Sequence, residues 1–248
     1  MDERGLAIFQ EFATQFGPNA SNVARHRYID DFLRARIARA PDLQIVLIGC
    51  GFDSRAFRLS GGTWYELDEP QLIAYKNDKL AASQAPNPLQ RIPIEFGVDS
   101  LEEKLRSIPP SAPTVFVIEG VTMYVPAESL RATLEILRCR FPSSEVIADL
   151  MTHNFIERYG RTIKRIIAQL GAQMIPGDAP DLPFEQAGYA EASSAAIIGL
   201  SFAYRGWGAL NPLLRLLMPG AYSGYTVRVY QVTSPAARET VSAPVGRH

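Results

Sequence analysis

The sequence predicts an α/β fold, with a seven-stranded, mostly parallel sheet, helices on both of its faces and a small helical cap. Three observations indicate this fold. Short apolar segments alternate with longer segments at helical spacing. The short segments are apolar throughout, as expected for strands that are buried on both faces. The chain has 248 residues, which is enough for one large buried core.

The first forty residues are expected to be a helical segment. A helix is predicted from residue 22 to residue 38, because Ile29, Leu33 and Ile37 recur at helical spacing. Pro41 ends this helix.

Strands and helices then alternate through a core spanning residues 41–150. Strands are expected at 44–48, 63–67, 91–98, 114–118 and 145–149, where β-branched and aromatic residues concentrate. Helices are expected at 72–82, 101–107 and 129–141, the last with Leu130, Leu134 and Leu137 on one stripe. The alternation predicts that consecutive strands lie parallel.

The remainder of the chain is less regular. A helix is expected at 155–170, a proline-containing loop at 174–183 and a sixth strand at 190–198. An inserted helix at 207–218 is interpreted as a cap over an acceptor pocket, and a seventh strand at 225–233 follows it. We therefore expect a single domain over residues 1–235, with an acceptor or cap region at 151–224 and a polar tail at 236–248.

The composition excludes several classes of protein. With 25 Lys and Arg against 26 Asp and Glu, the net charge is −1, so no nucleic-acid partner is expected. Hydrophobic residues make up 47% of the chain and charged residues 21%, which is too apolar for a disordered protein. Cys50 and Cys139 are too few for a disulfide framework and favour a cytoplasmic location. The longest apolar run, 114–125, is too short to span a bilayer, so no membrane partner is expected.

Glycines follow the first strand, at the sheet edge where parallel sheets bind ligands. Gly49 and Gly51 allow the backbone to turn sharply and to approach a ligand closely, although a plain strand-to-helix turn would use them equally well. Asp53 and Ser54 are both able to cap the next helix. Ser54 occupies the position where a dinucleotide-binding loop has its third Gly or Ala, which disfavours NAD.

Acidic residues follow the next three strands. Asp68 lies 17 residues after Gly51, close to the spacing at which an acid binds ribose hydroxyls, and Glu66 is an alternative. Asp99 and Ser100 either contact an adenine or cap the helix at 101–107. Glu119 ends an apolar strand, so it needs a cation: either a ligand ammonium or a nearby arginine. Together these positions predict nucleoside binding by a Rossmann-like sheet.

Five stretches in this order resemble the leucine carboxyl methyltransferase family. They are ARHRYIDDFL (24–33), LIGCGFDSRAFRL (47–59), WYELDEPQLIAYKNDKL (64–80), GVDS (97–100) and IEGVTMYVPAESL (118–130). The resemblance covers roughly residues 20–150, and it is closer to the bacterial branch that modifies natural products than to the branch that methylates protein phosphatases. It implies a Rossmann-like class I methyltransferase.

The resemblance also implies a cofactor and its contacts. S-adenosyl-L-methionine would be converted to S-adenosyl-L-homocysteine, and no metal is expected. The residues that match the family's cofactor positions are Arg25 (with Arg27 as the alternative), Gly49, Gly51, Asp53, Asp68, Asp99, Ser100 and Glu119.

The acceptor is expected to be a small molecule, either hydrophobic and anionic or bound to a carrier, that is methylated on a carboxylate by in-line transfer. A carboxylate is already ionised at neutral pH and needs no base, whereas a hydroxyl or phenol acceptor would need one. Tyr124, His153 and Arg205 are the candidates for orienting the acceptor, removing a proton and binding an anion. A nicotinamide-linked oxidoreductase and a cofactor-binding scaffold without catalysis are the alternative functions.

Overall fold

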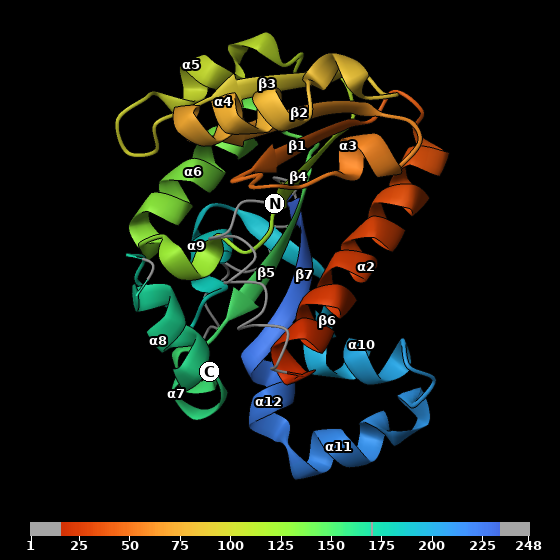
Figure 1. Cartoon of the computed structure of the whole chain (residues 1–248), viewed down its shortest axis with the longest axis vertical. Helices are drawn as coiled ribbons and strands as arrows, with labels where there is room; N and C mark the ends of the chain where they lie inside the picture. Colours follow the sequence, from red (N-terminus) through yellow and green to blue (C-terminus); the bar gives the residue numbers. More distant parts are fainter. Residues whose placement is uncertain (1–15, 170, 234–248) are drawn as a thin grey trace, which may run out of the picture.

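The computed structural model describes residues 16–169 and 171–233, in which seven strands form one twisted sheet (Figure 1). The strand order is β3-β2-β1-β4-β5-β7-β6, which confirms the predicted fold. The first five strands pair in parallel, and β7 is antiparallel to both β5 and β6. The strands are β1 (Gln44–Ile48), β2 (Thr63–Asp68), β3 (Leu89–Pro93), β4 (Thr114–Ile118), β5 (Glu145–Met151), β6 (Tyr189–Ala196) and β7 (Tyr225–Val232).

The central strands β1 and β4 are buried at every position, as their uninterrupted apolar sequences predict. Their register pairs Leu47 with Val117, and β1 pairs Ile48 with Leu67 of β2. The three carboxyl ends therefore meet at one edge of the sheet. The strand order reverses between β1 and β4, because the chain crosses from β3 at the outer edge to β4 beside β1, and this makes their carboxyl ends a topological switch point.

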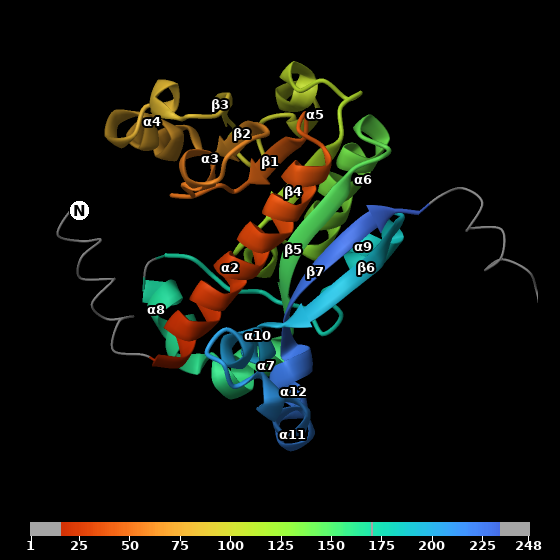
Figure 2. The ribbon, with the colours of Figure 1, turned by 90° about the vertical axis from the view of Figure 1, so that its right-hand side faces the viewer.

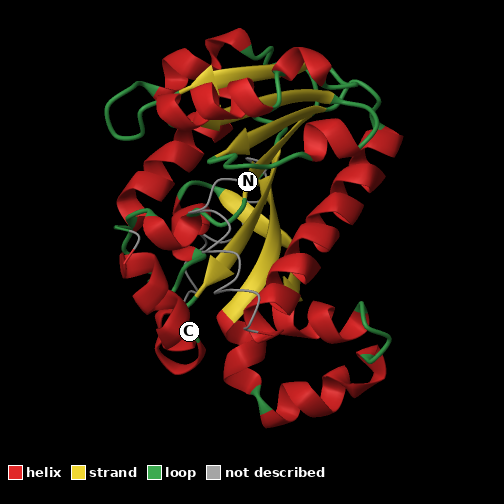
Figure 3. Cartoon of the chain, viewed as in Figure 1, coloured by secondary structure: helices red, strands yellow, loops and turns green. Residues whose placement is uncertain are grey.

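Helices cover both faces of the sheet (Figure 3). They are α2 (Phe16–Arg39), α3 (Arg55–Arg58), α4 (Pro70–Lys79), α5 (Leu101–Lys104), α6 (Ala127–Arg140), α7 (His153–Tyr159), α8 (Arg161–Gln169), α9 (Leu182–Gln186), α10 (Ile197–Ala203), α11 (Asn211–Leu217) and α12 (Pro219–Gly224). Short 3₁₀ turns are η1 (Ala82–Gln84), η2 (Leu105–Ser107), η3 (Thr122–Tyr124) and η4 (Gly208–Leu210).

Each face of the sheet has its own hydrophobic core. On one face, Ile29 and Leu33 of α2 pack against strand residues such as Val117. Figure 2 shows α2 lying across this face. On the other face, the predicted stripe of α6 packs against Phe116 and Val146. The alternate residues of each strand thus divide between the two cores.

Several element boundaries differ from the sequence predictions. Strand β3 ends at Pro93 rather than at residue 98, and the helix expected at 155–170 divides into α7 and α8 at Gly160, the C-cap residue of α7. The expected loop at 174–183 runs into the short helix α9. Helices α10 and α12 were not predicted, because Gly199 and the sequence PGAYSG favour turns locally. The tail at 236–248 lies outside the described residues, and the single-domain division stays a prediction.

The predicted cap helix begins later than expected. Trp207 precedes it, and the segment consists of η4 followed by α11. Among the described helices, none is both long and apolar enough to cross a bilayer.

Candidate functional site

A cavity of about 610 Å³ lies at the carboxyl ends of β1 and β4. Five of the predicted cofactor residues line it, namely Arg25, Gly49, Gly51, Asp53 and Glu119. Arg25 comes from α2, the two glycines and Asp53 from the loop after β1, and Glu119 from the end of β4. The fold therefore brings together residues that are up to 94 positions apart in the sequence.

The two glycines of the first loop have different tasks. Both have a positive φ, 71° at Gly49 and 49° at Gly51, in the left-handed region that favours glycine. A Cβ on Gly49 would lie 2.5 Å from Cγ2 of Val121, so this position requires close packing. A Cβ on Gly51 would have no atom within 4 Å. Because Gly51 lines the cavity, we infer that it keeps this side of the cavity open to a ligand.

Asp68 is fixed beside this loop. Its Oδ2 accepts a hydrogen bond from the Gly51 N–H at 2.7 Å, and its Oδ1 accepts one from the Glu69 N–H at 2.8 Å. Glu66, the alternative, is fully buried and lies 2.8 Å from Arg91 and 2.9 Å from Lys76. Of the two acids, only Asp68 lies at the glycine loop.

Arg25 and Glu119 form an ion pair at the edge of the cavity. Arg25 Nε donates to Glu119 Oε1 at 2.7 Å, and Arg25 Nη1 donates to Asp149 at 2.9 Å and to the Tyr225 hydroxyl at 2.5 Å. Asp149 in turn accepts the Gly120 N–H at 2.6 Å and the Tyr225 O–H at 2.9 Å. Side chains of β5 and β7, Asp149 and Tyr225, thus fix the orientation of the Arg25 guanidinium.

Arg55 is the second cation of the site, and its side chain is fully buried. It donates to Asp30 at 2.6 Å and to Glu119 at 2.7 Å, and it also bonds to Asp53. Its Nη2 lies 3.0 Å from Nδ1 of His26. Glu119 is therefore shared between two arginines.

This network sets the protonation states. Burial alone would raise the pKa of Glu119, but the guanidinium groups of Arg55 and Arg25 outweigh burial and hold that pKa below its usual value. Burial and the two arginines lower the pKa of His26, so its imidazole is neutral at pH 7. Burial raises the pKa of Cys50 to about 12, so this thiol in the loop remains un-ionised and is a packing residue.

A sequence model of the leucine carboxyl methyltransferase family matches residues 8–138. The chain belongs to this family. This assignment confirms the resemblance of the motifs, and it makes the chain an S-adenosylmethionine-dependent methyltransferase.

Relatives in mycobacteria agree with the family assignment. A Mycobacterium tuberculosis protein named "Putative S-adenosyl-L-methionine-dependent methyltransferase" is 30% identical over 221 residues, covering 82% of this chain and 67% of the relative. A protein of the same name from Mycolicibacterium paratuberculosis is 35% identical over 126 residues, covering 47% of this chain and 41% of the relative.

Solved structures share the fold. Magnesium protoporphyrin IX methyltransferase from Synechocystis, crystallised with S-adenosylhomocysteine, has a TM-score of 0.54 at 13% identity and covers 93% of this chain and 95% of its own. Geranyl diphosphate C-methyltransferase from Streptomyces coelicolor has a TM-score of 0.53 at 14% identity, and the match covers 83% of this chain and 80% of its own. At these identities the likeness concerns the fold alone.

The cavity of this family member suits the cofactor. S-adenosylmethionine is zwitterionic at its methionine end, and the cavity presents a guanidinium and a carboxylate, Arg25 and Glu119, side by side. The open space at Gly51 provides room next to the loop. Asp68 is hydrogen-bonded to this loop but does not line the cavity, and its contact with a ribose stays a prediction. Among the described residues, no cluster of His, Cys, Asp and Glu side chains is placed to hold a metal ion.

Asp99 and Ser100 are not among the residues that line the cavity. Asp99 is exposed, accepts the Glu95 N–H at 3.0 Å and pairs with Lys104 at 3.0 Å. Ser100 is the N-cap of α5 and accepts the Glu103 N–H at 3.3 Å. The alternative of a helix cap describes Ser100 well, and a contact with adenine stays a prediction for both.

The three residues predicted to act on the acceptor come from different elements. Tyr124 is half-buried in η3, and burial together with Asp149 raises its pKa. His153 is exposed at the start of α7, and Arg205 is exposed after α10. None of the three lines the cavity, whereas His26 does. Their roles stay predictions.

Sequence reasoning missed four members of the charged network, namely Asp30, Arg55, Asp149 and Tyr225. Arg55 stands inside the quoted loop motif, and Asp149 is the last residue of the strand predicted at 145–149, although β5 continues to Met151. Extending the strand-end reading to the fifth strand would have found Asp149. Nothing in the sequence pairs Tyr225 with Arg25.

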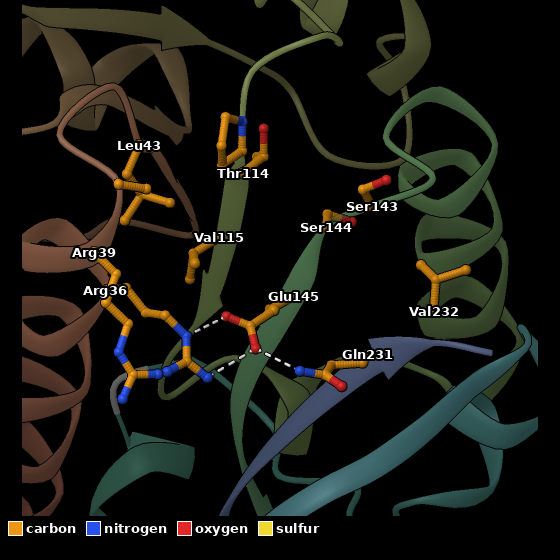
Figure 4. Close-up of a pocket in the computed structure, with 12 residues that line it drawn as sticks. Arg36, Arg39, Leu43, Thr114, Val115, Ser143, Ser144, Glu145, Gln231 and Val232 are labelled. Carbon is orange, nitrogen blue, oxygen red and sulfur yellow. Dashed lines mark hydrogen bonds and ion pairs between the residues drawn. The ribbon is translucent and has the colours of Figure 1, made fainter. Parts of the chain in front are cut away.

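A second cavity, of about 320 Å³, lies at the opposite edge of the sheet, where β4 and β5 begin (Figure 4). Glu145 occupies its centre, with Arg36 Nη2 at 2.9 Å and Gln231 Nε2 at 2.8 Å. Ligands of parallel sheets bind at the carboxyl ends of the strands. The Arg36–Glu145 pair lies at the other ends of the strands, so we assign it a structural role and use it for comparison with the Arg25–Glu119 pair.

Proposed function

We propose that the chain methylates a carboxylate oxygen of a small, natural-product-like acceptor and releases a methyl ester. The observation that carries this proposal is the pairing of the carboxylates in the cavity. Asp53 and Glu119 both bind Arg55, and Glu119 also binds Arg25. Neither is therefore placed to accept a proton, so the site favours an acceptor that is already ionised at neutral pH.

The imidazole in the cavity supports the same conclusion. His26 Nδ1 lies 3.0 Å from the Arg55 guanidinium and 3.1 Å from Glu119 Oε1, so its role as donor or acceptor depends on the tautomer of the ring. Burial lowers the pKa of His26, and the Arg55 and Arg25 guanidinium groups lower it further against the opposing charge of Glu119. The lowered pKa makes His26 a weaker base, which disfavours a hydroxyl or phenol acceptor.

The charged pair of the cavity has a defined task in this proposal. S-adenosylmethionine, when bound, supplies a methyl group on a positively charged sulfur. Glu119 would bind the ammonium of its methionine end, Arg25 the carboxylate, and Asp68 the ribose hydroxyls. Arg25 keeps Asp149 and Tyr225 as partners when Glu119 turns to the ligand, so the guanidinium stays oriented. Positioning rather than proton transfer is then the main contribution of the protein.

Product chemistry tests this proposal. The protein is incubated with S-adenosylmethionine carrying a trideuterated methyl group and with matched pairs of carboxylic acids and alcohols, and the products are analysed by mass spectrometry. We expect label in products of the acids, lost on mild alkaline hydrolysis because the product is an ester. Label found only in alkali-stable products of alcohols or phenols would overturn the proposal. The cytoplasmic location stays a prediction.

A further inference from the structure

Helix α11 has its apolar face turned towards solvent. Leu213, Leu216 and Leu217 have 54%, 77% and 66% of their surface exposed, and Trp207 just before the helix has 58% exposed. Leu210, at 47%, extends the same face by one turn, because it precedes Leu213 by three residues and Leu217 by seven. We call these five residues the leucine face.

The polar side of α11 faces the body of the protein. Asn211 Nδ2 donates to the Gly199 carbonyl of α10 at 3.1 Å, and its Oδ1 accepts the Tyr222 O–H of α12 at 2.8 Å. Asn211 and Arg215 line a cavity of about 980 Å³ that α10, α11 and α12 enclose with β6 and β7. The orientation is therefore fixed by hydrogen bonds, and burial of apolar side chains does not explain it.

The surroundings of the leucine face are basic. Helices α7, α10, α11 and α12 lie towards the lower end of the molecule in both views; α12 contacts α7, and α7 contacts α8 (Figures 1 and 2). Residues 153–169 and 197–224, which contain these helices, carry six basic side chains, Arg158, Arg161, Lys164, Arg165, Arg205 and Arg215. Their only acid is Glu157, which pairs with Lys164. The whole chain has a net charge of −1, so its charge is unevenly distributed, with an excess of positive charge in these two ranges.

We propose that this end of the molecule docks on the surface of an anionic lipid bilayer, with the leucine face inserted at the boundary between headgroups and acyl chains. Exposed leucines beside a tryptophan and several arginines are the combination that binds such an interface. Acidic headgroups complement the excess of basic side chains, and each basic residue near the surface adds to the attraction. Docking at a surface requires no spanning helix, so it revises the expectation of no membrane partner.

A second copy of the chain fits this surface less well. Two copies joined through their leucine faces would bring two basic ends together, each with six cations and one acid. A bilayer that contains acidic lipid has both an apolar interior for the leucine face and negatively charged headgroups for the basic side chains. The proposal does not depend on which acceptor is methylated. It does place helix α10, which packs on the helix that carries Arg25, close to lipid.

Vesicle binding tests the proposal with the full chain. Sedimentation is measured with phosphatidylcholine vesicles and with vesicles that also contain about 30% phosphatidylglycerol. We expect binding only to the anionic vesicles, and weaker binding as salt is raised. The triple variant Leu213→Ser, Leu216→Ser, Leu217→Ser should bind about tenfold or more weakly. So should the double variant Arg161→Glu, Arg165→Glu, because it reverses two charges.

Val98→Ser is the matched control, because Val98 is 74% exposed and precedes α5 at the other end of the molecule. Fluorescence gives a second readout: Trp64 is fully buried, so a blue shift on vesicle addition reports Trp207 and disappears in Trp207→Phe. No binding to anionic vesicles would overturn the proposal, as would equal binding to neutral ones. Binding that the leucine variant leaves unchanged, or a dimer in solution that this variant dissociates, would also overturn it.

Discussion

Arg25 and Glu119 are 94 residues apart in the sequence, yet Arg25 Nε lies 2.7 Å from Glu119 Oε1 at the edge of the cavity. Each has a further partner of opposite charge, Asp149 for Arg25 and Arg55 for Glu119. The pair is therefore held in place from both sides before any ligand arrives. Such preorganisation is what a site for a small zwitterion needs.

The glycines of the first loop should respond differently to alanine. Gly49→Ala places a methyl group 2.5 Å from Val121 in a left-handed backbone, so we expect a marked loss of stability in thermal unfolding. Gly51→Ala meets no neighbouring atom and should cost about 1 kcal/mol of stability through its backbone conformation alone. Its methyl group should nevertheless weaken S-adenosylhomocysteine binding in calorimetry. Unchanged affinity in Gly51→Ala would contradict the placement of the ligand beside this loop.

The two acids of β2 should separate binding from stability. Asp68→Asn removes a charge at the loop and one of the two acceptors of backbone N–H groups, so we expect adenosine to bind about 1–3 kcal/mol more weakly and stability to fall by only about 1 kcal/mol. Glu66→Gln leaves Lys76 and Arg91 buried without a counter-charge, which should lower the free energy of unfolding by about 3–5 kcal/mol. Calorimetry with adenosine and urea unfolding give the two readouts. The reverse pattern would show that Glu66 is the ribose acid.

Acid should destabilise the protein through Asp30. Burial opposes ionisation of Asp30, but Arg58 and Arg55 lower its pKa below the usual value. A carboxylate with a lowered pKa in the folded state stabilises the fold fully above its unfolded pKa of about 4, and this stabilisation is lost as the pH falls through the folded pKa.

Asp30→Asn should therefore lower the free energy of unfolding by about 3 kcal/mol at pH 7. In urea unfolding, its stability should also decline less steeply between about pH 5 and pH 3. Asp31→Asn is the control, because Asp31 pairs with Arg34 at the surface, where an ion pair contributes about 0–1 kcal/mol. An equally steep decline in Asp30→Asn and in the unmodified chain would count against this role of Asp30.

The sequence alone predicted the sheet and the sheet edge at which the cavity lies, because both depend on local patterns. Strands β1 and β4 are apolar runs followed by glycine or an acid, and parallel pairing brings their ends together. The central role of Arg55 was not predictable. Its partners come from α2, from its own loop and from the end of β4, and only the packing of these segments makes them neighbours.

The region after residue 150 was harder to predict for a related reason. Tyr225 reaches Arg25 because β7 runs antiparallel to β5 and pairs Tyr225 with Met151. The apolar pattern of a last strand predicts neither its direction nor its register with the neighbouring strand. Helix α12 contains two glycines and a proline and forms nonetheless, since its proline stands at the start, where no hydrogen bond is lost.

The central claim is that Arg25 and Glu119 bind the methionine end of the cofactor. It is tested most directly by the affinities of S-adenosylhomocysteine and of methylthioadenosine, which lacks the amino-acid end, for the unmodified chain and for Glu119→Gln. Glu145→Gln is the control, since Glu145 pairs with an arginine at the opposite edge of the sheet (Figure 4). We predict that Glu119→Gln weakens S-adenosylhomocysteine binding by about 1–3 kcal/mol and leaves methylthioadenosine unaffected. Equal effects on both ligands, or on neither, would contradict the claim.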